Sequence, residues 1–392
     1  MDVSFWLLFL MLGLGPGCRW PDQAPASVFE FSQSHQFPSS LDPDFPFVYS
    51  DKYKPALDSF FFRNYIQNQL SFSVLVARRD TILYEYARGY SDYIKKDPLH
   101  VRSAFQLASI SKPLTATAVL KLADQQLLSL DSPVSAYLTT FPYLKVTVRD
   151  LLCHRSGLSN YQFLDPAKVP EIRVGPISNQ QLLDILDTRN IRPDGSCNAF
   201  FRYCNTNYAL LASLVEKVSG MTFAAYMKQE IFDPSGMQDA FVGSCLDSFP
   251  KMKSYKSNWV EEREDFCDGI VGDKNIFASA RDLFHFHRAL REGVLLSEDM
   301  LREAYQPRSF EQRGQKNYGY GWRMYLRPDG TPDHVYHNGW WHGFTTRYYR
   351  NLEQDITIIV LSNKYTRIIY NTQPVLQIIQ EPLLPVPAED EP

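Results

Sequence analysis

Residues 105–126 read FQLASISKPLTATAVLKLADQQ, and the change of pattern within this stretch organises the interpretation of the whole chain. From Ser109 onward the apolar residues follow a helical pattern, which predicts a helix that begins at this serine. Lys112 lies three residues later, so a helix would place both side chains on one face. Pro113 agrees with this, because proline is tolerated in the first turn of a helix and not deeper.

Ser109 and Lys112 are therefore a candidate nucleophile and base. The exposed amides at a helix start favour a developing negative charge, and a desolvated lysine loses its proton more easily. Taken alone, the spacing favours two ordinary solvent-facing residues of a helix, because Ser-x-x-Lys occurs by chance in many chains, so the chemistry depends on what the rest of the chain supplies.

Strand patterns flank a long helical block. Residues 71–77 and 81–87 are β-rich and predict a hairpin. Helix starts are expected at Thr147, Ser178 and Ser279, and Gly220 is a candidate helix end. Strand patterns return after residue 317, and a last helix carries Pro374 in its first turn. This order predicts an α+β fold, in which an antiparallel sheet from both chain ends is flanked by helices and interrupted by an all-helical domain.

The expected domain boundaries follow from this order. Residues 66–108 and 275–385 would form the α/β sheet domain and 109–274 the mainly helical domain, with the active site between the two. Residues 19–65, rich in Pro, Ser, Asp and Phe, are interpreted as a linker and an irregular lead-in segment.

The N-terminus indicates export. The apolar run of residues 5–14 is too short to span a bilayer and is typical of a signal peptide covering residues 1–18. Cys18 follows Gly15-Pro16-Gly17, loosely as in a lipoprotein processing site, and is a candidate lipid anchor. We expect an exported protein of the periplasm or cell envelope, with its oligomeric state left open.

Composition excludes several classes of function. The net charge of −4 and the absence of a basic stripe argue against nucleic acid as a partner. The sequence has no CxxC pair, no His-Glu-x-x-His and no Gly-x-Ser-x-Gly, so neither zinc nor another cofactor is expected. In an exported chain Cys197 could pair with Cys204, or Cys245 with Cys267, but isolated buried thiols are the default.

Two further motifs add to Ser109 and Lys112. FRYCNTNYALL places Tyr203 and Asn205 just before a helix, where a tyrosine near a lysine could relay a proton. VYHNGWWHGF places His337, Asn338 and Gly339 on a predicted strand, and a strand glycine often marks the close approach of a backbone or ligand. The two tryptophans that follow could wall a cleft or simply pack.

Ser-x-x-Lys, Tyr-x-Asn and His-x-Gly in this order resemble the serine β-lactamase and penicillin-binding-protein superfamily, in its class C β-lactamase, DD-peptidase and esterase branch. The segments LLCHRSGLSNY, LDSPVSAYL, IFDPSGM and YGYGW resemble linkers of that branch. The resemblance covers about residues 66–380 and implies a β-lactamase/transpeptidase-like fold.

The resemblance also implies roles. Ser109 would be the acylated nucleophile, Lys112 its base, and Tyr203 the general base or acid for the leaving group and water. The backbone N–H groups of Ser109 and Trp340 would form the oxyanion hole.

Two more roles are implied around the substrate. Asn205 would orient Lys112 and the substrate, and His337 would replace the strand lysine and shape the electrostatics near Tyr203. Asn338 stands where the family usually has a hydroxyl that helps to hold a carboxylate, and Trp341 where a small polar residue is common. Both departures argue against a dedicated β-lactamase.

We therefore expect an exported serine hydrolase that cleaves an amide or ester, either a cell-wall peptide or a small molecule. Two alternatives stay open at this point. One is a β-lactamase proper, and the other is a non-catalytic cell-wall-binding or sensor protein that retains the fold.

Overall fold

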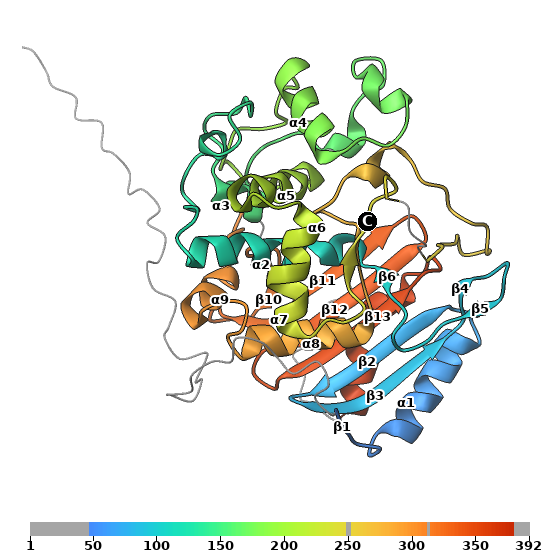
Figure 1. Cartoon of the computed structure of the whole chain (residues 1–392). Helices are drawn as coiled ribbons and strands as arrows, with labels where there is room; N and C mark the ends of the chain where they lie inside the picture. Colours follow the sequence, from blue (N-terminus) through green and yellow to red (C-terminus); the bar gives the residue numbers. More distant parts are fainter. Residues whose placement is uncertain (1–46, 248–251, 312–313, 380–392) are drawn as a thin grey trace, which may run out of the picture. The chain divides into compact units, whose positions relative to one another are not determined.

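The computed structural model describes residues 47–247, 252–311 and 314–379 of the chain. Its centre is an eight-stranded sheet of order β1-β3-β2-β13-β12-β11-β10-β9, antiparallel except for the β1–β3 pair (Figure 1). Its strands are β1 (Val48–Tyr49), β2 (Phe72–Arg78), β3 (Thr81–Arg88), β9 (Lys316–Tyr318), β10 (Arg323–Leu326), β11 (Pro332–Trp341), β12 (Phe344–Asn351) and β13 (Ile356–Ser362).

Two small sheets and a set of helices complete the described part of the chain. The small sheets pair β4 (Tyr90–Asp92) with β5 (Asp97–Pro98), and β6 (Phe105–Gln106) and β7 (Phe241–Val242) with β8 (Ile276–Ala278). The helices are α1 (Lys54–Phe61), α2 (Ser111–Asp124), α3 (Val148–Leu152), α4 (Asn179–Thr188), α5 (Asn205–Ser219), α6 (Phe223–Tyr226), α7 (Asp233–Ser235), α8 (Ala280–Arg291), α9 (Glu298–Ala304) and α10 (Gln373–Ile378).

The predicted hairpin and helix ends are confirmed. β2 and β3 pair as expected. Thr147, Ser178 and Ser279 each cap a helix through a hydrogen bond from the third residue of that helix, and Gly220 follows α5 with a left-handed φ of 71°. The mixed α/β fold, with strands from both chain ends in one antiparallel-rich sheet, is also as predicted.

The interpretation of the lead-in segment is wrong for the residues that the structure describes. Residues 54–61 form α1, and a single wider turn continues it to Ile66. Leu57, Phe61 and Tyr65 recur at intervals of four, the spacing of a helix face, and are buried in the main apolar cluster. Pro55 lies in the first turn of α1, where it is tolerated.

The sheet is covered on both faces. α1 and α10 pack with alternate residues of β2 and β13, including Val74, Val76, Ile358 and Val360. The other residues of these strands face α8, which lies on the opposite side of the sheet in Figure 1. Beyond α8, the 3₁₀ turn of residues 108–110 packs against β11 and β12. This contact brings the segment quoted above onto the strand that carries the histidine motif.

Several expectations about the chain ends lie outside the described residues. These are the signal peptide, the lipid anchor at Cys18 and most of the linker. Within the described ranges no helix is both long and apolar enough to cross a membrane. All five cysteines there are free thiols, so neither suggested disulfide is formed.

Candidate active site

Ser109 is the one residue between Phe105 and Leu120 that is not buried. It lies in the 3₁₀ turn of residues 108–110, and α2 begins two residues later than the sequence pattern predicted. Lys112, in the first turn of α2, is fully buried, and its Nζ lies 3.0 Å from Ser109 Oγ. The expected pair is therefore formed, with Ser109 at the surface and Lys112 beneath it.

Lys112 is held from below by a loop that is distant in sequence. Its Nζ donates to the carbonyl oxygen of Asp273 at 3.0 Å. The loop is tied to α2, because Thr115 Oγ1 donates to the carbonyl of Gly272 at 2.7 Å. Gly272 has a φ of 100°, and a Cβ there would lie 2.4 Å from the carbonyl oxygen of Tyr208. Only glycine allows this approach, which aims Asp273 at the lysine.

Burial lowers the pKa of Lys112 to about 7. Desolvation is the largest cause, since it penalises the ammonium form. The charges of Lys274 and Arg323 act in the same direction, and that of Asp273 opposes them. A substantial fraction of Lys112 is therefore neutral near pH 7 and able to accept the hydroxyl proton of Ser109.

Tyr203 lies beside this pair, two residues before α5. The centroid of its half-buried ring is 5.0 Å from Lys112 Nζ and 5.1 Å from the guanidinium carbon of Arg323. The ring of His154, which the sequence analysis did not single out, lies 4.4 Å from it. Tyr203 thus has the Lys112 amine and the Arg323 guanidinium on its ring.

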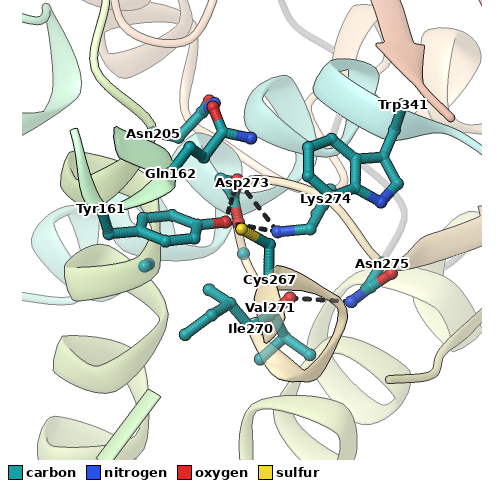
Figure 2. A network of polar contacts seen from close by, with 12 residues as sticks. Tyr161, Gln162, Asn205, Cys267, Ile270, Val271, Asp273, Lys274, Asn275 and Trp341 are labelled. Carbon is teal, nitrogen blue, oxygen red and sulfur yellow. Dashed lines mark hydrogen bonds and ion pairs between the residues drawn. The ribbon is translucent and has the colours of Figure 1, made fainter. Parts of the chain in front are cut away.

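Asn205 does not contact Lys112 as the resemblance implied. Its Nδ2 donates to Gln162 Oε1, while its buried Oδ1 has no hydrogen-bond partner among the described residues. Figure 2 shows Gln162 and Asn205 side by side. Gln162 is half-buried. Lys112 is therefore held by the Asp273 carbonyl rather than by Asn205.

His337 lies on the face of β11 that meets the Ser109 segment. Its Nδ1 is 2.7 Å from the carbonyl oxygen of Asn338, which can only accept, so Nδ1 carries the proton. Burial drives the pKa of His337 well below its usual value, and the charges of Arg323 and Lys112 reinforce the effect. His337 is therefore neutral, and the positive charge near Tyr203 comes from Arg323 instead.

Gly339 lies on the same face of β11 as His337 and contacts the backbone of the Ser109 segment. A Cβ at this position would lie 2.4 Å from the carbonyl oxygen of Leu107 and 2.1 Å from Thr346 Oγ1. The glycine therefore lets the nucleophile's segment rest directly on the strand. β10 pairs with β11 only up to Tyr336, so the strand beyond that residue is not paired with β10.

The side chain of Asn338 faces away from Ser109, which corrects the predicted substrate contact. Successive residues of a strand point to opposite faces, and Asn338 Oδ1 accepts a hydrogen bond from Arg347 at 2.7 Å. Arg347 in turn lies over the ring of Tyr336, within the core under α1. Asn338 therefore gives no information about the substrate.

The two tryptophans are also divided between the faces. Trp340 lies on the same face of β11 as Asn338, because it is two residues further along the strand. Its side chain is 57% exposed and packs against Tyr365. Trp341 lies on the site face, where its Nε1 donates to Asp268 Oδ1 at 2.6 Å. Its ring covers the ammonium of Lys274 at 4.6 Å. Only Trp341 can wall the cleft with its side chain, and Trp340 could contribute only its backbone N–H.

One group of side chains in the described part of the chain has the spacing of metal ligands. Asp265, Asp268 and His342 place their ligand atoms within 4.8 Å of one another. Both Asp268 oxygens already accept hydrogen bonds, from Trp341 and from His342 Nε2 at 2.9 Å. The hydrogen bonds among these side chains account for their spacing, since Asp268 holds the indole of Trp341 in place.

Several groups at the site come from elsewhere in the chain and were not predicted from the sequence. The segment GIVGDKN of residues 269–275 contained a signal, namely adjacent opposite charges in an apolar, glycine-containing loop. The sequence alone does not show that these two charges are buried, so it could not identify them as a buried ion pair. The groups missed are Tyr161, Gln162, His154, Asp273, Lys274 and Arg323.

Comparisons with known proteins agree with this geometry. The sequence profile of the family described as Beta-lactamase matches residues 61–369. Penicillin-binding protein 4* of Bacillus subtilis (strain 168) is 32% identical over 314 residues, which cover 76% of this chain and 69% of the relative. A D-aminopeptidase of Brucella anthropi is 26% identical, over 74% of this chain and 55% of its own length.

Solved structures show the same fold. A penicillin-binding protein from Bacillus halodurans aligns with a TM-score of 0.70 and 21% identity, covering 83% of this chain and 99% of the other. The D-amino acid amidase from Ochrobactrum anthropi SV3 complexed with L-phenylalanine aligns with a TM-score of 0.68 and 21% identity, covering 84% of this chain and 97% of the other.

Proposed function

Because the chain belongs to the beta-lactamase family and is a serine hydrolase of that family, we propose that it cleaves an amide or ester through an acyl-enzyme on Ser109. One observation carries the proposal. A buried Lys112, with its pKa lowered to about 7, lies 3.0 Å from the oxygen of the only residue in its segment that reaches the surface.

Acylation would begin with neutral Lys112 taking the proton of Ser109. The oxygen then attacks the substrate carbonyl, and backbone N–H groups of Ser109 and Trp340 would receive the developing negative charge. Support for this comes from β11, which leaves β10 after Tyr336 where the nucleophile's turn packs against it.

Tyr203 would handle the second proton. Positioned between Lys112 and Arg323, its hydroxyl can protonate the leaving group and later accept a proton from the water that attacks the acyl-enzyme. Lys112, which holds the proton taken from Ser109, would return it to Ser109 when the acyl group leaves.

For the substrate, we propose an amide or peptide of a D-amino acid. The amide pair of Gln162 and Asn205 could hydrogen-bond a peptide-like acyl group, since Asn205 Oδ1 has no partner of its own among the described residues. Relatives named D-aminopeptidase and D-amino acid amidase support the same class. Arg323 beside Tyr203 favours a substrate that carries a carboxylate.

Intact-protein mass after incubation with benzylpenicillin tests the nucleophile. We expect a covalent adduct on wild type and on Ser111→Ala, which removes a buried hydroxyl two residues away. Ser109→Ala should show no adduct. In parallel, wild type should hydrolyse D-alanine p-nitroanilide faster than L-alanine p-nitroanilide. Full hydrolytic activity in Ser109→Ala would overturn the proposal.

Export remains part of the proposal, on the basis of the apolar run of residues 5–14. Expression of the whole chain in a Gram-negative host, followed by fractionation, tests it. We expect the protein in the cell envelope, and Cys18→Ala should release it to the soluble periplasmic fraction if that cysteine is lipidated. Retention of wild type in the cytoplasm would contradict export.

A further inference from the structure

Two buried lysines flank one buried aspartate directly beneath Ser109. Lys112 Nζ donates to the backbone carbonyl of Asp273, and Lys274 Nζ lies 3.5 Å from the Oδ2 of the same aspartate. Relative exposures are 0% for Lys112, 1% for Asp273 and 2% for Lys274. Charges removed from water to this extent act strongly on each other.

Lys274 is fixed on the far side of the aspartate. Figure 2 shows its ammonium between Tyr161 and Trp341. It donates to the Tyr161 hydroxyl, lies 4.6 Å from the centroid of the Trp341 ring, and Tyr161 donates to Asp273 Oδ2 at 2.9 Å. The ammonium and carboxylate are thus joined both directly and through the phenol, so neither can turn to water.

The loop that carries the pair is anchored at several points. Val271 N donates to Asn179 Oδ1 at 2.9 Å, and Gly272 is held by Thr115 on α2. Gly272 also contacts the backbone of α5 too closely for any side chain. Because the loop is held at these points, it cannot shift to separate the charges. A change of charge at Asp273 or Lys274 should therefore alter the protonation equilibrium of Lys112.

We propose that Lys274 is a positioning residue that acts through Asp273 on Lys112. By neutralising the carboxylate, it prevents Asp273 from holding the catalytic lysine in its protonated form. This inference rests on the proposed role of Lys112 as the base. It extends that role by assigning the lysine's readiness to accept a proton to a charge pair some 160 residues away in sequence.

The other groups around Lys112 do not replace this control. The largest contribution to its low pKa is burial, which none of the substitutions below removes. Burial also holds the pKa values of His154 and His337 well below the usual range, so both are neutral at pH 6–8. The titratable or charged groups that face Lys112 are Ser109, His154, Tyr203, Cys204, Tyr208, Asp273, Lys274, Arg323 and His337.

The test is the pH dependence of covalent labelling of Ser109 by a fluorophosphonate probe, followed by intact mass from pH 5 to 10. Labelling requires the activated serine but no knowledge of the substrate. Wild type should lose reactivity as the pH falls through about 7, where Lys112 becomes protonated. The acid limb is the part of the pH profile in which labelling slows as the pH falls. Lys274→Met leaves the charge of Asp273 uncompensated and should move this limb to higher pH by about one unit. Labelling should then be about tenfold slower at pH 6 and unchanged at pH 9.

The opposite substitution should have the opposite effect. Asp273→Asn removes the anion and leaves Lys274, so the acid limb should move to lower pH. The double variant Lys274→Met/Asp273→Asn should return close to wild type, and Lys274→Arg should keep the limb in place. Lys121→Met is the matched control, since Lys121 on the same helix pairs with Glu230 outside the site. It should not move the limb.

Each outcome decides the inference. Superimposed acid limbs in wild type, Lys274→Met and Asp273→Asn would overturn it while leaving the proposed function intact. Absence of labelling in wild type at every pH would overturn the proposed function and this inference with it. If Lys274→Met does not fold, Asp273→Asn still decides, because a merely structural loss would not make labelling at pH 6 faster than in wild type.

Discussion

The two faces of β11 do different work, although their residues alternate within one short motif. On one face, His337, Gly339 and Trp341 meet the Ser109 segment and the Lys274 loop. On the other face, which α1 covers, Asn338 accepts a hydrogen bond from Arg347, and Trp340 is exposed. Because side chains of a strand alternate with a period of two, adjacent residues of a motif need not share a site.

The faces also differ in how they treat charge. On the site face, burial keeps Lys112, His154 and His337 at least partly neutral, which leaves bases without their protons. On the α1 face, the Arg347 guanidinium donates to Asn338 and lies over the rings of Tyr336 and Tyr349. Under the proposed function, the first arrangement would cost stability and provide reactivity, while the second would contribute stability alone.

Lys112→Met should have the largest effect and separates reactivity from stability. Loss of the base should reduce turnover by about a thousandfold or more. Methionine avoids burying an ammonium, so the melting temperature should rise by at least about 3 °C near pH 7. Activity assays and calorimetry measure the two effects, with Lys121→Met as the control that changes neither in this way.

The sign of the pH dependence follows from the lowered pKa of Lys112. Below pH 7 the folded lysine is protonated and the penalty is complete, whereas between about 7 and 10.5 the unfolded chain binds the extra proton. The stability of wild type should therefore rise relative to Lys112→Met across that window. A constant difference from pH 6 to 10 would contradict the buried neutral lysine.

Gly339→Ala tests the site face next. The added methyl group would collide with the Leu107 carbonyl and with Thr346, so the nucleophile's segment must move off the strand. We expect a loss of about a hundredfold in kcat/KM, because small misplacements at a nucleophile are costly. Gly330→Ala, in the β10–β11 turn, has open space around it and strains only a distant turn with a φ of 85°, so it should leave kcat/KM unchanged.

The two tryptophans give a direct comparison of the faces. Trp341→Ala uncovers Lys274 and removes the wall of the cleft, so kcat/KM should fall about tenfold. Trp340→Ala should stay within about twofold, because only its backbone is proposed to act. Equal effects in steady-state assays would show that the division between the faces does not govern function.

Asn338→Ala should have the smallest effect on activity and a clear effect on stability. It removes the acceptor of a buried hydrogen bond from Arg347, which should cost about 1–3 kcal/mol of unfolding free energy. Urea denaturation measures the loss, and kcat/KM should remain within about twofold. A large rise in KM with unchanged stability would restore the substrate role that the sequence suggested.

The success of sequence reasoning followed the range of the interactions. The Ser109–Lys112 pair, the β2–β3 hairpin and the caps at Thr147, Ser178 and Ser279 depend on residues a few positions apart, which helix and strand periodicity place together. The stripe of Leu57, Phe61 and Tyr65 was equally local, but the surrounding Pro and Ser residues concealed it.

By itself, then, the sequence determined the local geometry of the Ser109–Lys112 pair, the order of elements that predicts the fold, and the three motifs that indicate the family. Only the tertiary structure decided which face Asn338 takes, that Gln162 rather than Lys112 contacts Asn205, and that Asp273 and Lys274 complete the site. The physical reason is that dihedral preferences and periodicity act within a few residues. Burial and electrostatic pairing depend instead on what packing brings together across the chain.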